Sequence, residues 1–480
     1  MPGPSSLYMV IDQGGHASRA VIFNQQRQIV SMKSVAVVTL RRDTGCVEHD
    51  AEALIASIQG AIEGAVVTLG NRAGDIVSTG VATQRSSIVC WHKGSGVALS
   101  PVISWQDRRT AAAIHAYADQ SEAIHRLTGL MLSPHYGATK MQWCLDNLPN
   151  VQQAFRDDKL CCGPLSSFIL FRIVKERPFV VDPANASRTL LWNYHTADWE
   201  PELLQLFDVP INILPRCVPN RYDYGHITIR SRAIPVTVAT GDQSAALFAF
   251  GKPETDTTYI NMGTGAFLQR PVGSGPVAAN NLLSSVVWQS PDETVFVLEG
   301  TVNGAGSALQ QFAAGTGTSE QNIYKNIEKY LASISAPPLF LNGISGLGSP
   351  FWAPDFQSGF IGAGGQTERV VAVLESIVFL IAANLDEMTS VAGPSKILMV
   401  SGGLSAVDGL CQRLADLTDV RVKRPQLKEA TAHGAAYLLS GITGTAVPAT
   451  NFQPAPIQAL QQRYQKWLIE MKRNMPGVRI

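Results

Sequence analysis

The chain contains one short pattern twice: an apolar strand, a glycine turn and a second strand. The first copy spans residues 8–24 around Gly14-Gly15, and the second spans residues 256–270 around Gly263-Thr264-Gly265. Strands joined by a tight glycine turn form a hairpin, and the backbone N–H groups of such a turn can face a phosphate without side-chain obstruction. Because one hairpin heads each half of the chain, we expect two duplicated domains that clasp one phosphate chain from both sides.

Chain length supports two domains, and the net charge argues against some classes of binding partner. A chain of 480 residues is too long for one ordinary core. Its formal net charge of zero argues against nucleic acid or a membrane surface as a partner held by charge. We expect no apolar run of membrane-spanning length and no signal peptide. The seven cysteines form no C-x-x-C motif, which indicates reduced thiols and a cytoplasmic protein.

The stretch from Ile234 to Gly251 places a carboxylate at the end of a strand. Residues 234–240 are apolar and β-branched and predict a short buried strand, and Gly241 permits a turn before Asp242. Open α/β sheets carry their chemistry at this edge. Asp242 is therefore a candidate catalytic acid or base, with a helix cap as the alternative.

Polar residues also follow other predicted strands. Arg85 and Ser86 end the strand at 76–83, and Trp105 follows an apolar run in the same way. A tryptophan at such a position can form a wall for a sugar or polyol, although a core position is the alternative. His135 lies in a loop before a helix, where a structural role is the more common one.

Further expectations concern phosphate and nucleotide contacts and helix ends. Asp12 could hold a metal ion and Arg19 could meet phosphate oxygens, although an ordinary hairpin needs neither role. Gly402-Gly403 follows the strand at 397–400, which suits either a nucleotide contact or a tight turn. We expect Asp50 to cap a helix over residues 51–69, and Asp107 to cap a helix that runs through Ala118.

Taken in order, these stretches resemble the FGGY family of carbohydrate kinases, and within it the glycerol kinases. The matching motifs are IDQGGHASRAV (11–21), VEHD (47–50), TQR (83–85), SWQDRRT (104–110), NASRTLLWNYHTADW (185–199), GDQSAALF (241–248), MGTGAF (262–267), LEG (298–300), GLGSPFW (346–352), SGGL (401–404) and EATAHGAAYL (429–438).

The resemblance implies an α/β fold of two duplicated ribonuclease-H-like (actin-like ATPase) domains with a catalytic cleft between them. Residues 1–248 would form the acceptor-binding N-terminal domain, and residues 249–480 the nucleotide-binding C-terminal domain. The hinge is expected near residues 249–252. The implied reaction transfers the ATP γ-phosphoryl group, with Mg²⁺, to a hydroxyl of a small polyol or sugar.

The resemblance also implies roles for individual residues. Asp242 matches the general base, and Asp12 and Asp242 match the carboxylates on the magnesium side. The implied substrate contacts are Arg85, Ser86, Trp105, His135, Asp242, Gln243 and Phe267. The implied ATP contacts are Gly14, Gly15, His16, Arg19, Gly263, Thr264, Gly306, Gln310, Gly402 and Gly403.

The chain departs from the family pattern at five positions. Ser86 stands where glycerol kinases carry a glutamate, and His135 replaces a substrate-facing tyrosine. Gly15 and His16 replace two threonines of the first hairpin, and Val407 replaces an asparagine near the nucleotide base. We therefore expect an active kinase with an altered acceptor pocket. The alternatives are a glycerol kinase proper and a catalytically weak carbohydrate-binding or regulatory protein, and a homo-oligomer is left open.

Overall fold

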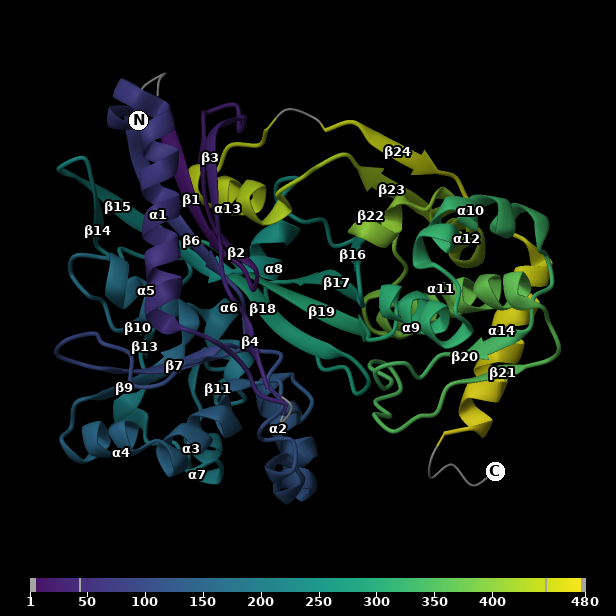
Figure 1. Cartoon of the computed structure of the whole chain (residues 1–480), viewed down its shortest axis with the longest axis horizontal. Coiled ribbons are helices and arrows are strands. Elements are labelled where there is room, and N and C mark those ends of the chain that lie inside the picture. Colours follow the sequence, from purple (N-terminus) through teal and green to yellow (C-terminus); the bar gives the residue numbers. More distant parts are fainter. Residues whose placement is uncertain (1–5, 43–44, 445–446, 476–480) are drawn as a thin grey trace.

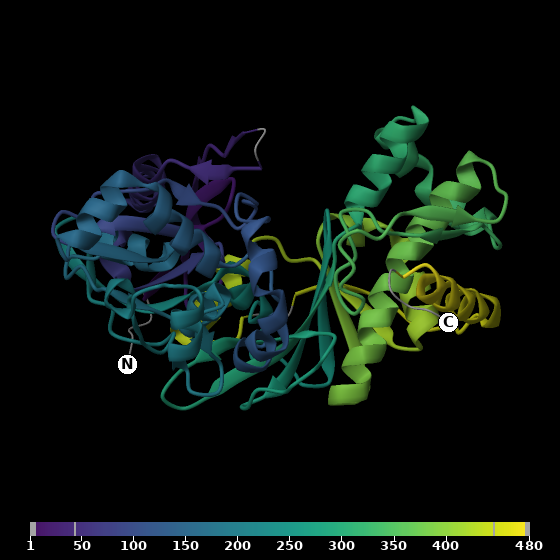
Figure 2. The same cartoon turned by 90° about the horizontal axis from the view of Figure 1, so that it is seen from below.

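Two α/β halves, joined on one side of the molecule, make up the fold (Figures 1 and 2). The structure is a computed structural model that describes residues 6–42, 45–444 and 447–475. Each half contains a large β-sheet with helices packed against it.

The sheet of the first half has six strands in the order β14-β15-β6-β1-β2-β3. Their bounds are β1 (Leu7–Gln13), β2 (Ala17–Phe23), β3 (Ile29–Ala36), β6 (Ile76–Thr83), β14 (His226–Ile229) and β15 (Arg232–Gly241). Strands β1, β6 and β15 are parallel, and Gln13, Thr83 and Gly241 lie in register where they end. The residues that follow these strands therefore emerge at one edge of the sheet.

The sheet of the second half has seven strands in the order β18-β19-β17-β16-β22-β23-β24. Their bounds are β16 (Thr257–Met262), β17 (Ala266–Gly273), β18 (Leu283–Gln289), β19 (Thr294–Val302), β22 (Ile397–Ser401), β23 (Arg421–Pro425) and β24 (Ala449–Phe452). From β19 to β24 the strands pair antiparallel, antiparallel, parallel, parallel and antiparallel, as they do from β3 to β14. This shared order is the duplication that the two hairpins predicted.

A smaller sheet and several helices complete the first half. The sheet has the order β4-β5-β8-β7-β9. Its strands are β4 (Leu40–Arg41), β5 (Val47–His49), β7 (Ile88–His92), β8 (Val102–Ile103) and β9 (Leu160–Pro164). Two short pairs are β10 (Val180–Val181) with β13 (Arg216–Cys217) and β11 (Trp192–Asn193) with β12 (Asp198–Trp199). The helices are α1 (Ala51–Leu69), α2 (Ser121–Thr128), α3 (Gly137–Asn147), α4 (Pro149–Arg156), α5 (Leu165–Ile173), α6 (Pro183–Ala186) and α7 (Pro201–Leu206).

The remaining helices are α8 (Asp242–Leu247), α9 (Gly306–Thr316), α10 (Glu320–Ser333), α11 (Gln366–Ala392), α12 (Asp408–Thr418), α13 (Ala430–Ser440) and α14 (Gln458–Arg473). A short pair, β20 (Leu339–Leu341) with β21 (Gly359–Ile361), lies beside them. Helix α11 is buried through most of its length in the core of the second half.

Two helix expectations have different outcomes. Asp50 caps α1 as predicted, because its carboxylate accepts a hydrogen bond of 2.8 Å from the N–H of Ala53. The prediction for Asp107 is wrong. Its carboxylate instead accepts from the N–H of Val47 at 2.6 Å and pairs with Arg109, and a 3₁₀ helix begins only at Ala113.

The expectation about apolar runs also needs correction. Within the described residues, one helical stretch, Ala51–Asp75, is long and apolar enough to cross a membrane by length and composition. It packs on β2 and β3 of the first sheet. A helix of the core passes the same test, so the stretch is weak grounds for a membrane span.

Helix α13 comes late in the chain but packs on the first sheet and on α8. The closest approach is at Gly434, where an added Cβ would lie 1.7 Å from the carbonyl oxygen of Ala245. Only glycine allows the two helix backbones this contact. Since α8 begins at Asp242, the contact also fixes the strand end that carries this carboxylate.

We predict that Gly434→Ala destabilises the protein by about 1–3 kcal/mol, the usual range for overpacking, because α8 and α13 must separate. Denaturant unfolding measures the change. Gly60→Ala in α1 is the matched control, since its added Cβ has no neighbour closer than 3.8 Å, and it should be neutral or stabilising. Equal stability of the two variants would contradict the close-contact explanation.

Candidate active site

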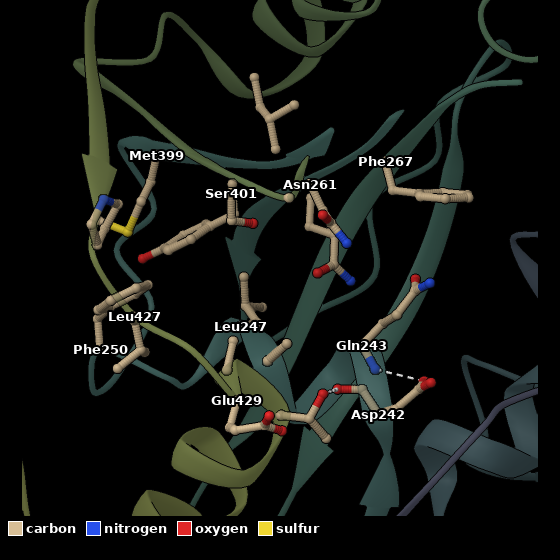
Figure 3. Close-up of a pocket in the computed structure, with 18 of the residues that line it drawn as sticks. Asp242, Gln243, Leu247, Phe250, Asn261, Phe267, Met399, Ser401, Leu427 and Glu429 are labelled. Atoms are coloured by element: carbon tan, nitrogen blue, oxygen red, sulfur yellow. Dashed lines mark hydrogen bonds between the residues drawn. The ribbon is translucent and has the colours of Figure 1, made fainter. Parts of the chain in front are cut away.

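A cavity of about 400 Å³ lies between the two halves. Figure 3 shows Asp242 and Gln243 at one end and the apolar side chains of Phe250, Met399 and Leu427 at the other. Its lining residues are Asp12, Arg19, Asp242, Gln243, Ala246, Leu247, Phe250, Tyr259, Ile260, Asn261, Phe267, Gln269, Met399, Val400, Ser401, Gly402, Pro425, Leu427, Glu429, Ala430 and Thr431.

Asp242 is the first residue of α8, and Gly241 occupies the cap position. One oxygen of its carboxylate accepts a hydrogen bond of 2.7 Å from the N–H of Gln243. Burial raises the pKa of Asp242, while the charge of Arg85 opposes the rise. A carboxylate with a raised pKa is a better proton acceptor, so the position suits a general base more than a helix cap.

Asp12 lies near Asp242 on the same side of the cavity. Burial and the charge of Asp242 raise the pKa of Asp12 to about 7, and Arg19, 3.3 Å away, opposes the rise. Arg19 also lies 3.6 Å from Glu429. Among the described residues no three carboxylates, histidines or cysteines form a metal cage. Two carboxylates suit Mg²⁺, which keeps waters and takes phosphate oxygens as its other ligands.

The first glycine turn leaves its surroundings open. The N–H of Gly14 donates to Ala17, and an added Cβ at Gly15 would meet nothing within 4 Å. The side chain of His16 is exposed, and its carbonyl accepts from Val37 at 2.9 Å. This turn therefore has space for a ligand but keeps no hydroxyl side chain to bind one.

The second glycine turn is tied to the start of α9. The N–H of Gly306 donates to the carbonyl of Gly263 at 3.0 Å, and an added Cβ at Gly306 would lie 2.8 Å from that oxygen. Thr264 is exposed, and its carbonyl accepts from Ala305 at 3.1 Å. Gln310, further along α9, is also exposed. The structure thus groups Gly263, Thr264 and Gly306 at one end of α9.

Close packing explains the first glycine of the pair after β22 but not the second. Gly402 has φ +87°, and an added Cβ would lie 2.4 Å from the carbonyl of Met262. An added Cβ at Gly403 would meet nothing within 4 Å. Val407, which replaces the expected asparagine, is only 5% exposed and belongs to the core. Its side chain therefore does not line the cavity.

Two arginines meet one carboxylate beside Asp242. Arg85 donates to Gln243 at 2.7 Å and lies 3.4 Å from Glu299. Arg188 donates to both oxygens of Glu299 at 2.5 Å. Glu299 belongs to β19 of the second half, whereas both arginines belong to the first. Burial raises the pKa of Glu299, but the two arginines outweigh it and lower the pKa to about 2.

Ser86, Trp105 and His135 form a group next to Arg85. Ser86 has φ +62°, and its buried hydroxyl has no hydrogen-bond partner among the described residues. The rings of Trp105 and His135 are 5.6 Å apart. Burial and the nearby cation of Lys140 lower the pKa of His135 well below its ordinary value, so its imidazole is neutral near pH 7.

The side chain of Lys140 links the backbone segments of this group. Its ammonium is fully buried and donates to three carbonyl oxygens, those of His135 at 2.7 Å, Ser104 at 2.9 Å and Ser86 at 3.3 Å. It therefore fixes the three backbone segments that carry the group. The sequence reading missed Lys140, because a lysine inside a helix pattern carries no signal of its role.

The structure brings ten of the eighteen predicted site residues together, and the other eight do not line the cavity: Gly14, Gly15, His16, Gly263, Thr264, Gly306, Gln310 and Gly403. Those that line the cavity are Asp12, Arg19, Asp242, Gln243, Phe267 and Gly402. Arg85 donates a hydrogen bond to Gln243, which lines the cavity, and Ser86, Trp105 and His135 lie beside Arg85. Sequence reasoning also missed the roles of Arg188 and Glu299, although both lie in motifs that it singled out.

Comparisons with known proteins agree with this geometry. Residues 7–249 match the N-terminal domain, and residues 258–440 the C-terminal domain, of the FGGY family of carbohydrate kinases. A glycerol kinase of Trichlorobacter lovleyi is 35% identical over 90% of this chain and 89% of its own length. A glycerol kinase of Burkholderia cenocepacia is 33% identical over 90% and 88%.

Solved structures confirm the predicted fold. Glycerol kinase of Plasmodium falciparum with ADP has a TM-score of 0.88, with 20% identity and 99% of each chain covered. Xylulose kinase of Lactobacillus acidophilus has a TM-score of 0.84, with 18% identity and 97% of each chain covered. At this identity the likeness concerns the fold of two ribonuclease-H-like domains alone. Together with the sequence matches, it places the chain in the FGGY family of carbohydrate kinases, as an ATP-dependent kinase that acts on a polyol or sugar.

Proposed function

We propose that this kinase phosphorylates a polyol or sugar larger than glycerol. Ser86 is the observation that carries the proposal, because its short neutral side chain leaves a buried hydroxyl without a partner beside Arg85. A glutamate there could accept hydrogen bonds from two hydroxyls of a small triol, whereas serine leaves room for a longer acceptor.

In the proposed mechanism Asp242 accepts the proton of the attacking hydroxyl. Arg85 and Gln243 orient the acceptor, with Trp105, His135 and Phe267 beside its carbon skeleton. Phosphoryl transfer depends on positioning and charge neutralisation more than on covalent chemistry. Bound Mg²⁺, held on the side of Asp12 and Asp242, would supply charge neutralisation at the phosphates.

The proposed ATP contacts come from both halves of the molecule. Arg19 and the first turn (Gly14, Gly15, His16) belong to the first half. The contacts of the second half are Gly263, Thr264, Gly306, Gln310, Gly402 and Gly403. The proposed domains are residues 1–248 and 249–480, with helix α13 of the second domain packed back on the first. The cytoplasmic location, the lack of nucleic-acid and membrane partners and the oligomeric state stay predictions.

Glycerol itself is the second candidate acceptor. The relatives at 33–35% identity are named glycerol kinases. In that case, a bound water molecule would replace the carboxylate that Ser86 lacks.

We predict that Asp242→Asn lowers kcat by about 10²–10⁴-fold, because an amide cannot accept the proton. Acceptor affinity should change little, and steady-state kinetics with a binding measurement separate the two effects. Asp198→Asn is the matched control, since Asp198 is exposed and likewise accepts from the N–H of the next residue, at 2.8 Å. If Asp242→Asn keeps more than about half of the wild-type rate, the assignment fails.

We further predict that the double variant Ser86→Glu, His135→Tyr shifts preference toward glycerol. A restored charged acceptor is worth on the order of tenfold to a hundredfold in affinity. The measurement is the ratio of kcat/KM for glycerol to that for a C4 or C5 polyol or a ketose, with the two single variants as controls. If the ratio is unchanged, or if glycerol is the best acceptor of the wild type, then Ser86 and His135 do not select a larger acceptor.

A further inference from the structure

A second cavity, of about 330 Å³, lies where the chain passes between the halves. We name it the hinge cavity. Its lining residues are Gln26, Arg27, Ala249, Phe250, Met399, Lys423, Pro425, Leu427, His433, Thr443, Gly444 and Val447. It shares Phe250, Met399, Pro425 and Leu427 with the first cavity, so these four side chains form the wall between the two.

Arg27 is a buried cation without a counterion among the described residues. It is 6% exposed and lies in the turn between β2 and β3 with φ +58°. Its guanidinium donates to the carbonyls of Ala249 at 2.8 Å and His433 at 2.5 Å. Its Nε has no hydrogen-bond partner. An unpaired buried charge is costly, and a site for an anion would compensate it.

Two other basic side chains line the same cavity. Lys423 on β23 is half-buried, and its ammonium forms no ion pair with a carboxylate of the described residues. The imidazole of His433 packs edge-on against Phe23 and makes no side-chain hydrogen bond to the described residues. The hydroxyl of Thr443 and the amide of Gln26 add polar groups. The described residues that line the cavity include no aspartate or glutamate, so the charge of these residues is positive without compensation.

We propose that the hinge cavity binds a small dianion, namely a phosphate group that is free or carried by a metabolite. A guanidinium, an ammonium and a neutral imidazole N–H can each donate to phosphate oxygens. The volume exceeds that of one phosphate, which leaves room for a short carbon chain against Phe250 and Leu427. This binding claim does not depend on which acceptor the kinase uses.

The position of the cavity gives such a ligand a conformational effect. Arg27 belongs to the first half and Lys423 to the second. The two carbonyls that Arg27 binds belong to Ala249, just after α8, and to His433 within α13. A dianion between Arg27 and Lys423 therefore favours the arrangement of the halves in which the two cations are close. A ligand shifts a conformational equilibrium in this way by its differential affinity for the two states.

The test is calorimetric titration of the full chain with inorganic phosphate. We expect Lys423→Glu to weaken phosphate binding by about tenfold or more, because a charged donor is lost and a like charge added. Lys325→Glu, on the exposed side of α10, makes the same change of net charge and should keep wild-type affinity. Lys423→Gln repeats the test if the reversal impairs folding, which thermal unfolding detects.

Phosphate at the kinase site would bind equally in Lys423→Glu and Lys325→Glu, so equal affinities overturn the proposal, as does the absence of binding to the wild type. A parallel titration with glycerol 2-phosphate identifies the source of the dianion. Tighter binding of the ester than of inorganic phosphate points to a phosphorylated metabolite, and weaker binding points to free phosphate. If Lys423→Glu loses binding of both inorganic phosphate and glycerol 2-phosphate, the two ligands share the hinge cavity as proposed.

Discussion

The buried carboxylate of Glu299 joins the two halves of the molecule beside Asp242. It comes from β19 of the second half and lies between Arg85 and Arg188 of the first, with Gln269 donating to it at 3.3 Å. Three charged groups buried together are stable only as a set, because removal of one leaves another unpaired. The pKa of Glu299, about 2, lies below that of an exposed glutamate. Its stabilising effect is therefore complete above about pH 4.5 and is lost as the pH falls toward 2.

The rest of the site follows from how the backbone brings residues to this carboxylate. Strands β1, β6 and β15 are parallel and end in register, so Asp12, Arg85 and Asp242 lie at one edge of the sheet. Gly241 permits this arrangement, because an added Cβ would lie 2.4 Å from the side chain of Arg85. Arg85 then reaches Gln243 and Glu299 together, and Ser86 next to it carries no charge.

Local sequence patterns predicted the features that depend on local physics. The two glycine hairpins, the cap at Asp50 and the strand end before Asp242 are all set by turn, cap and strand chemistry within a few residues. The duplication of the two sheets followed from the repeated hairpin. The fold and kinase class came from motifs in order along the chain, which the family matches confirm.

Features set by distant contacts could not be predicted in the same way. In the sequence Asp107 resembles a cap, but its carboxylate accepts hydrogen bonds from the N–H of Val47 and the guanidinium of Arg109. Lys140 lies in a helix pattern and acts through three carbonyls on other segments. The partners Arg188 and Glu299 are separated by 111 positions, so no local pattern connects them. Helix α1 is long and apolar enough to cross a membrane when its sequence is considered alone. Its place as a helix of the core is seen only from its packing on β2 and β3.

The most direct test of this account is the unfolding free energy of Glu299→Gln. A neutral amide leaves Arg85 and Arg188 buried without their counterion, so the loss should reach about 3–5 kcal/mol. Glu293→Gln is the control, because Glu293 pairs with Lys252 at the surface, where an ion pair contributes about 0–1 kcal/mol. Equal losses in the two variants would contradict the role assigned to Glu299.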